Sequence, residues 1–324
     1  MNLSGNTVSV NLQELAVLSN NESITPGYIL EVKTLQISSF KILIEALKEI
    51  LKDATIKFTP VFYEANGEIS PSSGISIVAM NKSTSVLIRL KLPATKFEKF
   101  FVKSKKPVMI GVNMTCFNKL IKTITNDDQM LTLFLEENDQ NHLGIKIENL
   151  EKNTSTTFKL NVLDSENEDM NIQNSEFEAV VTMEASGFQK IIRDMSNICD
   201  AVNIIFVDGV NNRNTLIFQG KGEFASQKTI LQAKESDSGT DASNDYTKEL
   251  IIQGTYDLRN LSLFSKLSNL CTNIDLFMKN NFPLIIKYQI ANLGHIYLVL
   301  SHKTIDDNED DEDEQETNND LEYY

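Results

Sequence analysis

The sequence predicts an α+β protein made of two similar domains, each with a duplicated unit of one helix and several antiparallel strands. Two observations lead to this prediction. A strand-like apolar run passes directly into an amphipathic helix-like run four times along the 324 residues, and the four expected helices start at regular intervals. A regular period of this kind is typical of a duplicated structural unit. The hydrophobic content of 41% is sufficient for two ordinary cores.

The four passages from strand to helix follow one another in order. Alternating or continuous apolar runs predict the strands, and apolar residues spaced by three and four predict the helices. The expected helices start at residues 38, 115, 186 and 258, which are 71 to 77 residues apart. The strands and the helices that follow them are Tyr28–Leu35 and Ser38–Lys52, Val108–Asn113 and Thr115–Ile124, Glu178–Met183 and Ser186–Cys199, and Leu250–Tyr256 and Leu258–Cys271.

Further strand-like runs lie between the helices. They are Leu131–Glu136, Leu143–Ile147, Thr157–Leu163, Leu216–Gln219 and Thr229–Gln232. Two units per domain place the domain boundary in a polar stretch that is rich in Asn, Asp and Glu. We therefore expect domains at 28–163 and 176–305, an interdomain connector at 164–175 and an acidic tail at 306–324.

The net charge of −15 is concentrated in that last segment. Eleven acidic residues and no Lys or Arg lie between Asp306 and Glu322, which leaves 30 basic against 34 acidic residues elsewhere. Like charges repel and there is little apolar surface to bury, so the tail is expected to be disordered. The nearly neutral remainder still allows a local basic surface that contacts nucleic acid.

Basic residues gather on one side of each expected helix. Lys41, Lys48 and Lys52 fall within roughly 40° of one another at about 100° per residue. The other helices carry pairs spaced by three or seven: Lys119 with Lys122, Lys190 with Arg193, and Arg259 with Lys266. The opposite sides are apolar, with residues such as Leu43, Leu47, Ile121, Ile192, Met195, Phe264 and Leu267. A charged helix side is usually plain solvated surface, but its repetition on four equivalent helices favours a shared role.

No residue pattern typical of an enzyme or a metal site is found. The three histidines (His142, His295, His302) share no metal-ligand spacing with the three cysteines (Cys116, Cys199, Cys271). Gly220-Lys-Gly222 lacks the rest of a phosphate-binding loop, and Asp127-Asp128 is more typical of a turn than of a catalytic carboxylate pair. We therefore expect no enzymatic activity, no cofactor and no metal.

The chain is expected to be a soluble intracellular protein. The first eleven residues lack the basic start and apolar run of a signal peptide, and no long apolar run would span a membrane. Three scattered cysteines are typical of free thiols in a reducing compartment rather than of a disulfide framework.

Four segments resemble sequences of the proliferating cell nuclear antigen family. Ile110–Lys122 (IGVNMTCFNKLIK) is similar to that family's second passage from strand to helix, and Phe188–Val202 (FQKIIRDMSNICDAV) to its third helix and next strand. Phe282–His295 (FPLIIKYQIANLGH) resembles its C-terminal strands, and Ile44–Ile50 (IEALKEI) its first helix. The likeness runs in order from about Tyr28 to Lys303.

This resemblance implies the DNA-clamp fold, in which six similar domains form a ring, helices line a central channel and strands form the outer sheet. A chain with two domains would close the ring as a homotrimer. The implied function is that of a DNA polymerase processivity factor, a sliding clamp that encircles double-stranded DNA independently of sequence during DNA replication and DNA repair. The implied partners are DNA polymerase, other replication and repair proteins that carry clamp-binding peptides, and an ATP-dependent clamp loader, but no membrane.

The resemblance also assigns residues to three sites. The DNA-facing residues would be Lys41, Lys48, Lys52, Lys119, Lys122, Lys190, Arg193, Arg259 and Lys266. The pocket for partner peptides would be formed by Met80, Leu87, Met170, Ile172, Pro283 and Val299. The subunit interface would join one edge around His142–Asn149, with His142, Leu143, Ile145 and Ile147, to another at Phe224–Ala233, with Phe224, Thr229 and Leu231.

Several features depart from the family pattern. Residues 1–27 form an N-terminal extension, and Val61–Ser72 is an expected insertion between two strands. Abundant Asn is what an AT-rich genome encourages, so a viral or protist source is one expectation; the compartment would be the nucleus, or a cytoplasmic replication compartment for a virus. Leu321, Tyr323 and Tyr324 end the acidic tail, and we weigh docking of these residues on the peptide pocket against a merely solvating tail.

Two other binding functions stay open from the sequence. One is a checkpoint-type clamp subunit, which would need two different partner chains. The other is a monomeric viral processivity factor that binds DNA by charge without encircling it.

Overall fold

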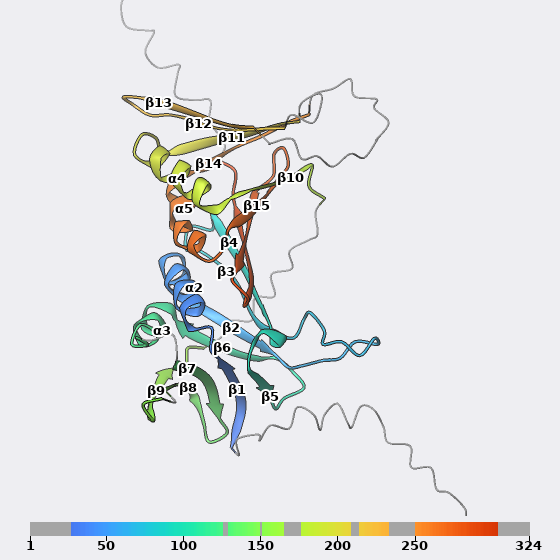
Figure 1. The fold of residues 1–324 in the computed structure, drawn as a ribbon, viewed down its shortest axis with the longest axis vertical. Helices are drawn as coiled ribbons and strands as arrows, with labels where there is room; N and C mark the ends of the chain where they lie inside the picture. Colours follow the sequence, from blue (N-terminus) through green and yellow to red (C-terminus); the bar gives the residue numbers. More distant parts are fainter. Residues whose placement is uncertain are drawn as a thin grey trace, which may run out of the picture. The chain divides into compact units, whose positions relative to one another are not determined.

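The computed structural model describes residues 27–125, 129–149, 151–164, 176–208, 214–232 and 250–303 (Figure 1). These residues form two compact units, each with its own set of internal contacts. The first unit takes the described residues up to 78, residues 90–164 and residues 292–294. The second takes residues 79–89 and the remaining described residues from 176 onward.

The first unit contains two helices and most of the strands of the N-terminal half. One antiparallel sheet has the strand order β5-β1-β7-β8-β9, and β4, β3, β2 and β6 are neighbours in that order in another. The elements are β1 (Tyr28–Thr34), α2 (Ile37–Ile50), β2 (Asp53–Thr59), β3 (Gly74–Met80), β4 (Val86–Pro93), the 3-10 helix η1 (Ala94–Lys96), β5 (Lys99–Val102), β6 (Val108–Asn113), α3 (Met114–Ile121), β7 (Gln129–Glu136), β8 (Asp139–Asn149) and β9 (Thr154–Asn161).

The second unit repeats this plan. A four-stranded sheet has the order β13-β12-β11-β14, and β10, β15, β16 and β17 are neighbours in that order. The elements are β10 (Ala179–Glu184), α4 (Ala185–Ser196), β11 (Ala201–Asp208), β12 (Thr215–Lys221), β13 (Ser226–Gln232), β14 (Leu250–Asp257), α5 (Leu258–Leu263), the 3-10 helix η2 (Ser265–Asn269), β15 (Asn273–Met278), β16 (Leu284–Ile290) and β17 (Gly294–Leu300).

The helices lie in pairs, and their apolar sides form the cores with the sheets. In the first unit α2 packs against α3, where the rings of Phe40 and Phe117 meet edge to face with 6.3 Å between centroids. In the second unit α4 packs against α5, and Phe188 of α4 meets Phe218 of β12 at 6.1 Å. All four rings are buried, and α5 buries Leu258 and Leu261, so each helix packs an apolar side into a core.

The change from strand to helix is abrupt in two places because a side chain caps the helix. The Asn113 side chain accepts a hydrogen bond from Cys116 N at 3.0 Å at the start of α3. At the start of α5, the Asp257 carboxylate accepts hydrogen bonds from Arg259 N and Asn260 N at 2.7 and 3.2 Å. Such caps satisfy backbone N–H groups that have no partner within the helix.

All four predicted passages from strand to helix are confirmed, and each α-helix ends earlier than predicted, the last by the most. The predicted helix Leu258–Cys271 ends as an α-helix at Leu263 and continues as the 3-10 helix η2. The Ser262 hydroxyl donates to Leu258 O at 2.7 Å, a local bond that competes with regular helix geometry.

The predicted insertion 61–72 is an arm between β2 and β3. Tyr63 and Ile69 form an isolated antiparallel bridge within it, and Gly67 N donates to Glu64 O at 2.9 Å to close its turn. Gly67 has φ +80°, a conformation that glycine adopts without strain. Nearly all of the predicted N-terminal extension and connector, and the acidic tail, lie outside the described residues.

Candidate nucleic-acid interface and docking surfaces

Of the basic residues predicted on α2, Lys41 is held against the protein. Its side chain is half-buried, and its Nζ donates to Ile124 O at 2.6 Å. Ile124 follows α3, so this bond links the two helices of the first unit. Lys41 therefore helps to hold α2 against the end of α3.

The other basic residues of the first unit lie closer to solvent. Lys48 pairs with Glu49 at 3.0 Å and Lys122 with Glu45 at 3.2 Å, pairs that reduce the local positive charge only partly. Lys52, which follows α2, and Lys119 on α3 are exposed.

The second unit presents an equivalent set on α4 and α5. Lys190, Arg193 and Arg259 are exposed, while their neighbours Ile191, Ile192 and Leu258 are buried. Arg193 lies 3.6 Å from Asp194, yet 70% of its side chain remains exposed. The side chain of Lys266 lies outside the described residues. Each unit thus has a pair of packed helices with cations on the solvent side.

The prediction of a subunit edge around His142–Asn149 is wrong, because these residues lie on an interior strand of the sheet. These residues belong to β8, which pairs with β7 on one side and with β9 on the other. Leu143, Ile145 and Ile147 are buried in the core of the sheet. The edge strand next to β8 is β9, Thr154–Asn161, because in the described sheet nothing pairs with its far side.

The second predicted edge lies where the sequence indicated. Strand β13 is at the edge of its four-stranded sheet and pairs only with β12 among the described strands. Phe224, just before this strand, is 79% exposed, and Thr229 and Leu231 are half-buried. Strands β9 and β13 are therefore two edges that could pair with another copy, at the opposite ends of their sheets from the edge strands β5 and β14.

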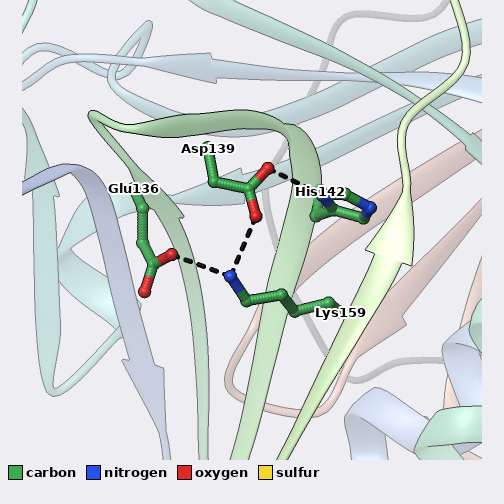
Figure 2. A network of polar contacts seen from close by, with 4 residues as sticks. All are labelled: Glu136, Asp139, His142 and Lys159. Carbon is green, nitrogen blue, oxygen red and sulfur yellow. Dashed lines mark hydrogen bonds and ion pairs between the residues drawn. The ribbon is translucent and has the colours of Figure 1, made fainter.

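A polar network fixes the end of β9 against the turn between β7 and β8 (Figure 2). Lys159 Nζ donates to Asp139 Oδ2 at 2.8 Å and to Glu136 Oε2 at 3.0 Å. On the other side of the same carboxylate, His142 Nδ1 lies 2.6 Å from Asp139 Oδ1. Figure 2 shows Asp139 between the two basic side chains.

This network shifts the ionisation of its members. The hydrogen bond from Lys159, followed by that from His142, lowers the pKa of Asp139 to about 2. In turn, Asp139 and Glu136 raise the pKa of Lys159. Asp139 therefore stays ionised throughout the neutral and mildly acidic range and keeps the hairpin and the edge strand joined.

The predicted peptide pocket is partly described, and its described residues lie in the second unit. Met80 ends β3 and is 43% exposed, while Leu87, Pro283 and Val299 are half-buried. Strands β16, β17, β4 and β3 are neighbours in that order, and Ser301 N donates to Ser85 O at 3.0 Å. Val299 and Leu87, each two residues from that contact, therefore share one side of the sheet. Met170 and Ile172 lie outside the described residues.

The same side of the sheet carries an apolar band that was not predicted from the sequence. We define the apolar band as Val180 of β10, Phe277 of β15, Ile285 of β16 and Tyr297 of β17. Val180 pairs with Phe277, and Phe277 with Ile285, while the rings of Phe277 and Tyr297 lie 6.4 Å apart. Strict alternation of buried and half-exposed residues in β15 and β17 is the signal that could have revealed it.

Two more aromatic rings extend the apolar band at one end. Phe177 contacts Phe277 and Phe282 edge to face, with centroid distances of 5.4 and 5.8 Å. Lys279 Nζ lies 5.8 Å from the centre of the Phe282 ring. The band is thus a half-exposed apolar surface with a cation beside it.

Other kinds of site find no support in the described part of the chain. It contains no group of three or more His, Cys, Asp or Glu side chains placed to hold a metal ion. Burial raises the pKa of the Cys199 and Cys271 thiols, the opposite of what activates a nucleophilic cysteine. Among the described helices, none combines the length and apolar character needed to cross a membrane.

Comparisons with known proteins agree with the geometry. The family model for the N-terminal domain of proliferating cell nuclear antigen matches residues 29–169, and the model for its C-terminal domain matches residues 171–303. The chain is 30% identical over 273 residues to a "Probable DNA polymerase sliding clamp 1" of Paramecium bursaria Chlorella virus 1, covering 84% of this chain and 96% of the relative.

It is also 27% identical over 299 residues to a "Probable DNA polymerase sliding clamp" of Acanthamoeba polyphaga mimivirus, covering 84% of this chain and 62% of that relative. Two consecutive domain models together span nearly all of the described residues, in the order and at the lengths that the duplicated units require. The chain belongs to the proliferating cell nuclear antigen family.

Proposed function

We propose that this chain is a DNA polymerase processivity factor, three copies of which close into a ring that slides along double-stranded DNA. The observation that carries the proposal is that both units of this chain, a member of the family, have the same arrangement of helices and cations. In each unit, two packed helices bury their apolar sides and present cations to solvent. Members of this family are non-catalytic, which agrees with a role in binding alone.

The exposed cations are suited to contact with phosphates and not to reading bases. Lys and Arg side chains on helices attract the phosphate backbone without regard to sequence, and the attraction weakens as salt rises. Acidic neighbours such as Glu45 and Asp194 lie within 4 Å of some of these cations and moderate the attraction. A moderate attraction supports sliding, because the closed ring itself keeps the protein on the DNA.

Ring closure would use the two strand edges. An unpaired edge presents backbone N–H and C=O groups that readily pair with another strand. Pairing of β9 from one copy with β13 from the next satisfies these two edges, and repeated rotation closes a ring in which neither of them is free. The network of Glu136, Asp139, His142 and Lys159 fixes β9 in place for this pairing.

The exposed Met80 and its neighbours Leu87, Pro283 and Val299 would dock peptides from DNA polymerase and from other replication and repair proteins. A flexible methionine side chain suits a surface that accepts several partners. We further propose that an ATP-dependent clamp loader opens the ring. The protein would work in the nucleus, or in a cytoplasmic replication compartment if its source is viral like its relatives.

The helix cations provide the direct test. Changing Lys119, Lys122, Lys190 and Arg193 to Ala should leave folding and assembly intact, because these side chains are exposed. Stimulation of a polymerase on long primed templates should fall about tenfold, and its dependence on salt should flatten because fewer phosphate contacts remain.

A matched control removes the same charge elsewhere. Lys103, Lys105 and Lys106 in the loop after β5, and Lys221 at the end of β12, are exposed and lie outside the helices. Changing these four to Ala should leave stimulation near the wild-type value. If the helix variant and this control stimulate equally, the helices do not form the DNA surface.

A further inference from the structure

The apolar band presents side chains that a ligand could cover. Val180 is 56% exposed, and Phe277, Ile285 and Tyr297 are half-exposed. Half-exposed aromatic and aliphatic side chains in one row across four strands gain free energy when a further apolar side chain covers them. The row continues toward Val299 and Leu87 on the same side of the sheet.

Several cations lie near the band. Lys279 lies beside Phe282, and Lys287 is adjacent to Ile285 on β16. Arg89 is exposed on β4, on the side of the sheet that carries Leu87, and Lys303 is exposed where the described chain stops. The acidic partner of Lys287 is Asp275 at 3.5 Å. Glu178, two residues before Val180, accepts a hydrogen bond from Asn280 N at 3.4 Å, so the charge around the band is mixed. Lys279 and Arg89 are the cations that an acidic occupant would contact.

The chain leaves the second unit after a strand that contributes to this surface. Strand β17, which contributes Tyr297 and Val299, ends at Leu300. Lys303 N donates to Thr255 O at 2.8 Å, which holds the last described residue on the body of the unit. The next 21 residues, 304–324, contain ten acidic residues followed by Leu321, Glu322, Tyr323 and Tyr324.

We propose that residues 304–324 fold back onto their own unit, with Leu321, Tyr323 and Tyr324 on the apolar band. The acidic run would lie against Lys279, Lys287 and Arg89. A purely solvating segment has no need of three large apolar side chains in its last four residues, whereas a docking segment does. The segment and the band are complementary in apolar character, and Lys279, Lys287 and Arg89 provide cations for the acidic run.

The length of the segment permits this contact. Tyr297 lies six residues before Lys303, about 20 Å back along the strand. Eighteen residues separate Lys303 from Leu321, and a flexible chain of that length has an r.m.s. span of about 25 Å, more when like charges extend it. The three apolar residues therefore reach the band without stretching the chain.

Docking would be weak and would compete with other ligands. Attachment by a flexible linker gives an effective concentration on the order of 1 mM. If the free segment binds with a Kd of about 0.1 mM, the attached segment occupies the band about nine-tenths of the time, and an outside ligand binds about tenfold more weakly. Competition with partner peptides rests on the proposed function, but docking itself rests only on the band and the segment.

The test uses a fluorescein-labelled synthetic peptide of residues 304–324 and two forms of the protein, the full chain and a chain ending at Lys303. The truncated protein should bind the peptide about tenfold more tightly than the full chain, because the attached segment no longer competes. A peptide with Tyr323→Ser and Tyr324→Ser keeps every charge, and it should bind the truncated protein at least fivefold more weakly.

Surface variants locate the site. Ile285→Glu in the truncated protein should weaken binding at least fivefold, whereas Gln289→Glu, an exposed position on the same strand, should leave it within twofold. Thermal unfolding of both variants checks that the fold persists. If Ile285→Glu unfolds the protein, Tyr297→Glu replaces it.

Three results would overturn the proposal: equal affinity of the peptide for the full and truncated proteins, equal binding of the serine peptide, or no loss in the band variants. None of these results bears on ring formation, which solution mass measures separately. Failure of this inference and failure of the proposed function are therefore distinguishable.

Discussion

Lys41 and Lys119 carry the same charge on adjacent helices, yet their surroundings differ. Lys41 is half-buried and donates to Ile124 O, whereas Lys119 is exposed. Helical spacing predicted both residues on polar sides, but spacing does not reveal which cation bonds to a backbone carbonyl from a distant segment. At the residue scale, the basic residues therefore divide into those that hold the helices together and those that face solvent.

Lys41→Met tests this division. The methionine keeps an apolar stem but loses the bond to Ile124 O, at a cost of about 1 kcal/mol. In a protein of this size, the midpoint of thermal unfolding should fall by about 2–4 °C. Lys119→Met is the matched control, and its midpoint should stay within about 1 °C of wild type because the residue is exposed. Equal midpoints for the two variants would show that the Lys41 bond adds no stability.

The carboxyl of Asp139 gives a second prediction at this scale. Carbon NMR of the side chain should show titration near pH 2, against about 3.9 for an ordinary aspartate. The lowered pKa favours the folded state above about pH 4, and this contribution is lost as the pH falls from about 4 toward 2. Lys159→Met should move the titration back toward the ordinary value, while Lys152→Met in the turn before β9 should not. An unmoved titration in Lys159→Met would contradict the assigned cause.

At the scale of elements, the sequence predicted whether a segment is a helix or a strand better than it predicted which strands are neighbours in a sheet. The four passages from strand to helix were correct because apolar periodicity is a local property of the sequence. The predicted edge at His142–Asn149 was wrong because β8 and β9 differ mainly in their neighbours, which local sequence does not specify. Burial of Leu143 and Ile145 on one side of β8 is equally compatible with an interior or an edge strand.

Proline substitutions test β9 as the assembly edge. Backbone N–H groups alternate in direction along a strand, so one of Thr156→Pro and Thr157→Pro removes a bond to β8 and the other removes an outward N–H. The variant that loses a bond to β8 should have lower thermal stability. The variant that loses an outward N–H should stay folded and yet fail to assemble. Thr157→Ala keeps every backbone bond and should assemble normally. Assembly by both proline variants would exclude β9 from the interface.

At the scale of the whole molecule, the duplicated pattern made the fold predictable from the sequence. It made the binding surfaces only partly predictable. Four repeats of one pattern predicted the two-unit plan and placed the basic residues on the helices or directly after them. Assignment of residues 79–89 to the second unit was not predictable, because it depends on contacts between segments about 200 residues apart, such as Ser85 with Ser301. The apolar band was missed for the same reason, since its four residues come from four separate strands.

The solution mass tests the ring most directly. Light scattering from the full chain at micromolar concentration should give about three times 36.5 kDa, because two strand edges per chain pair head to tail until the ring closes. The mass should hold over a wide dilution range. A stable single-chain mass of 36.5 kDa under these conditions would contradict the account, since a monomer cannot encircle DNA.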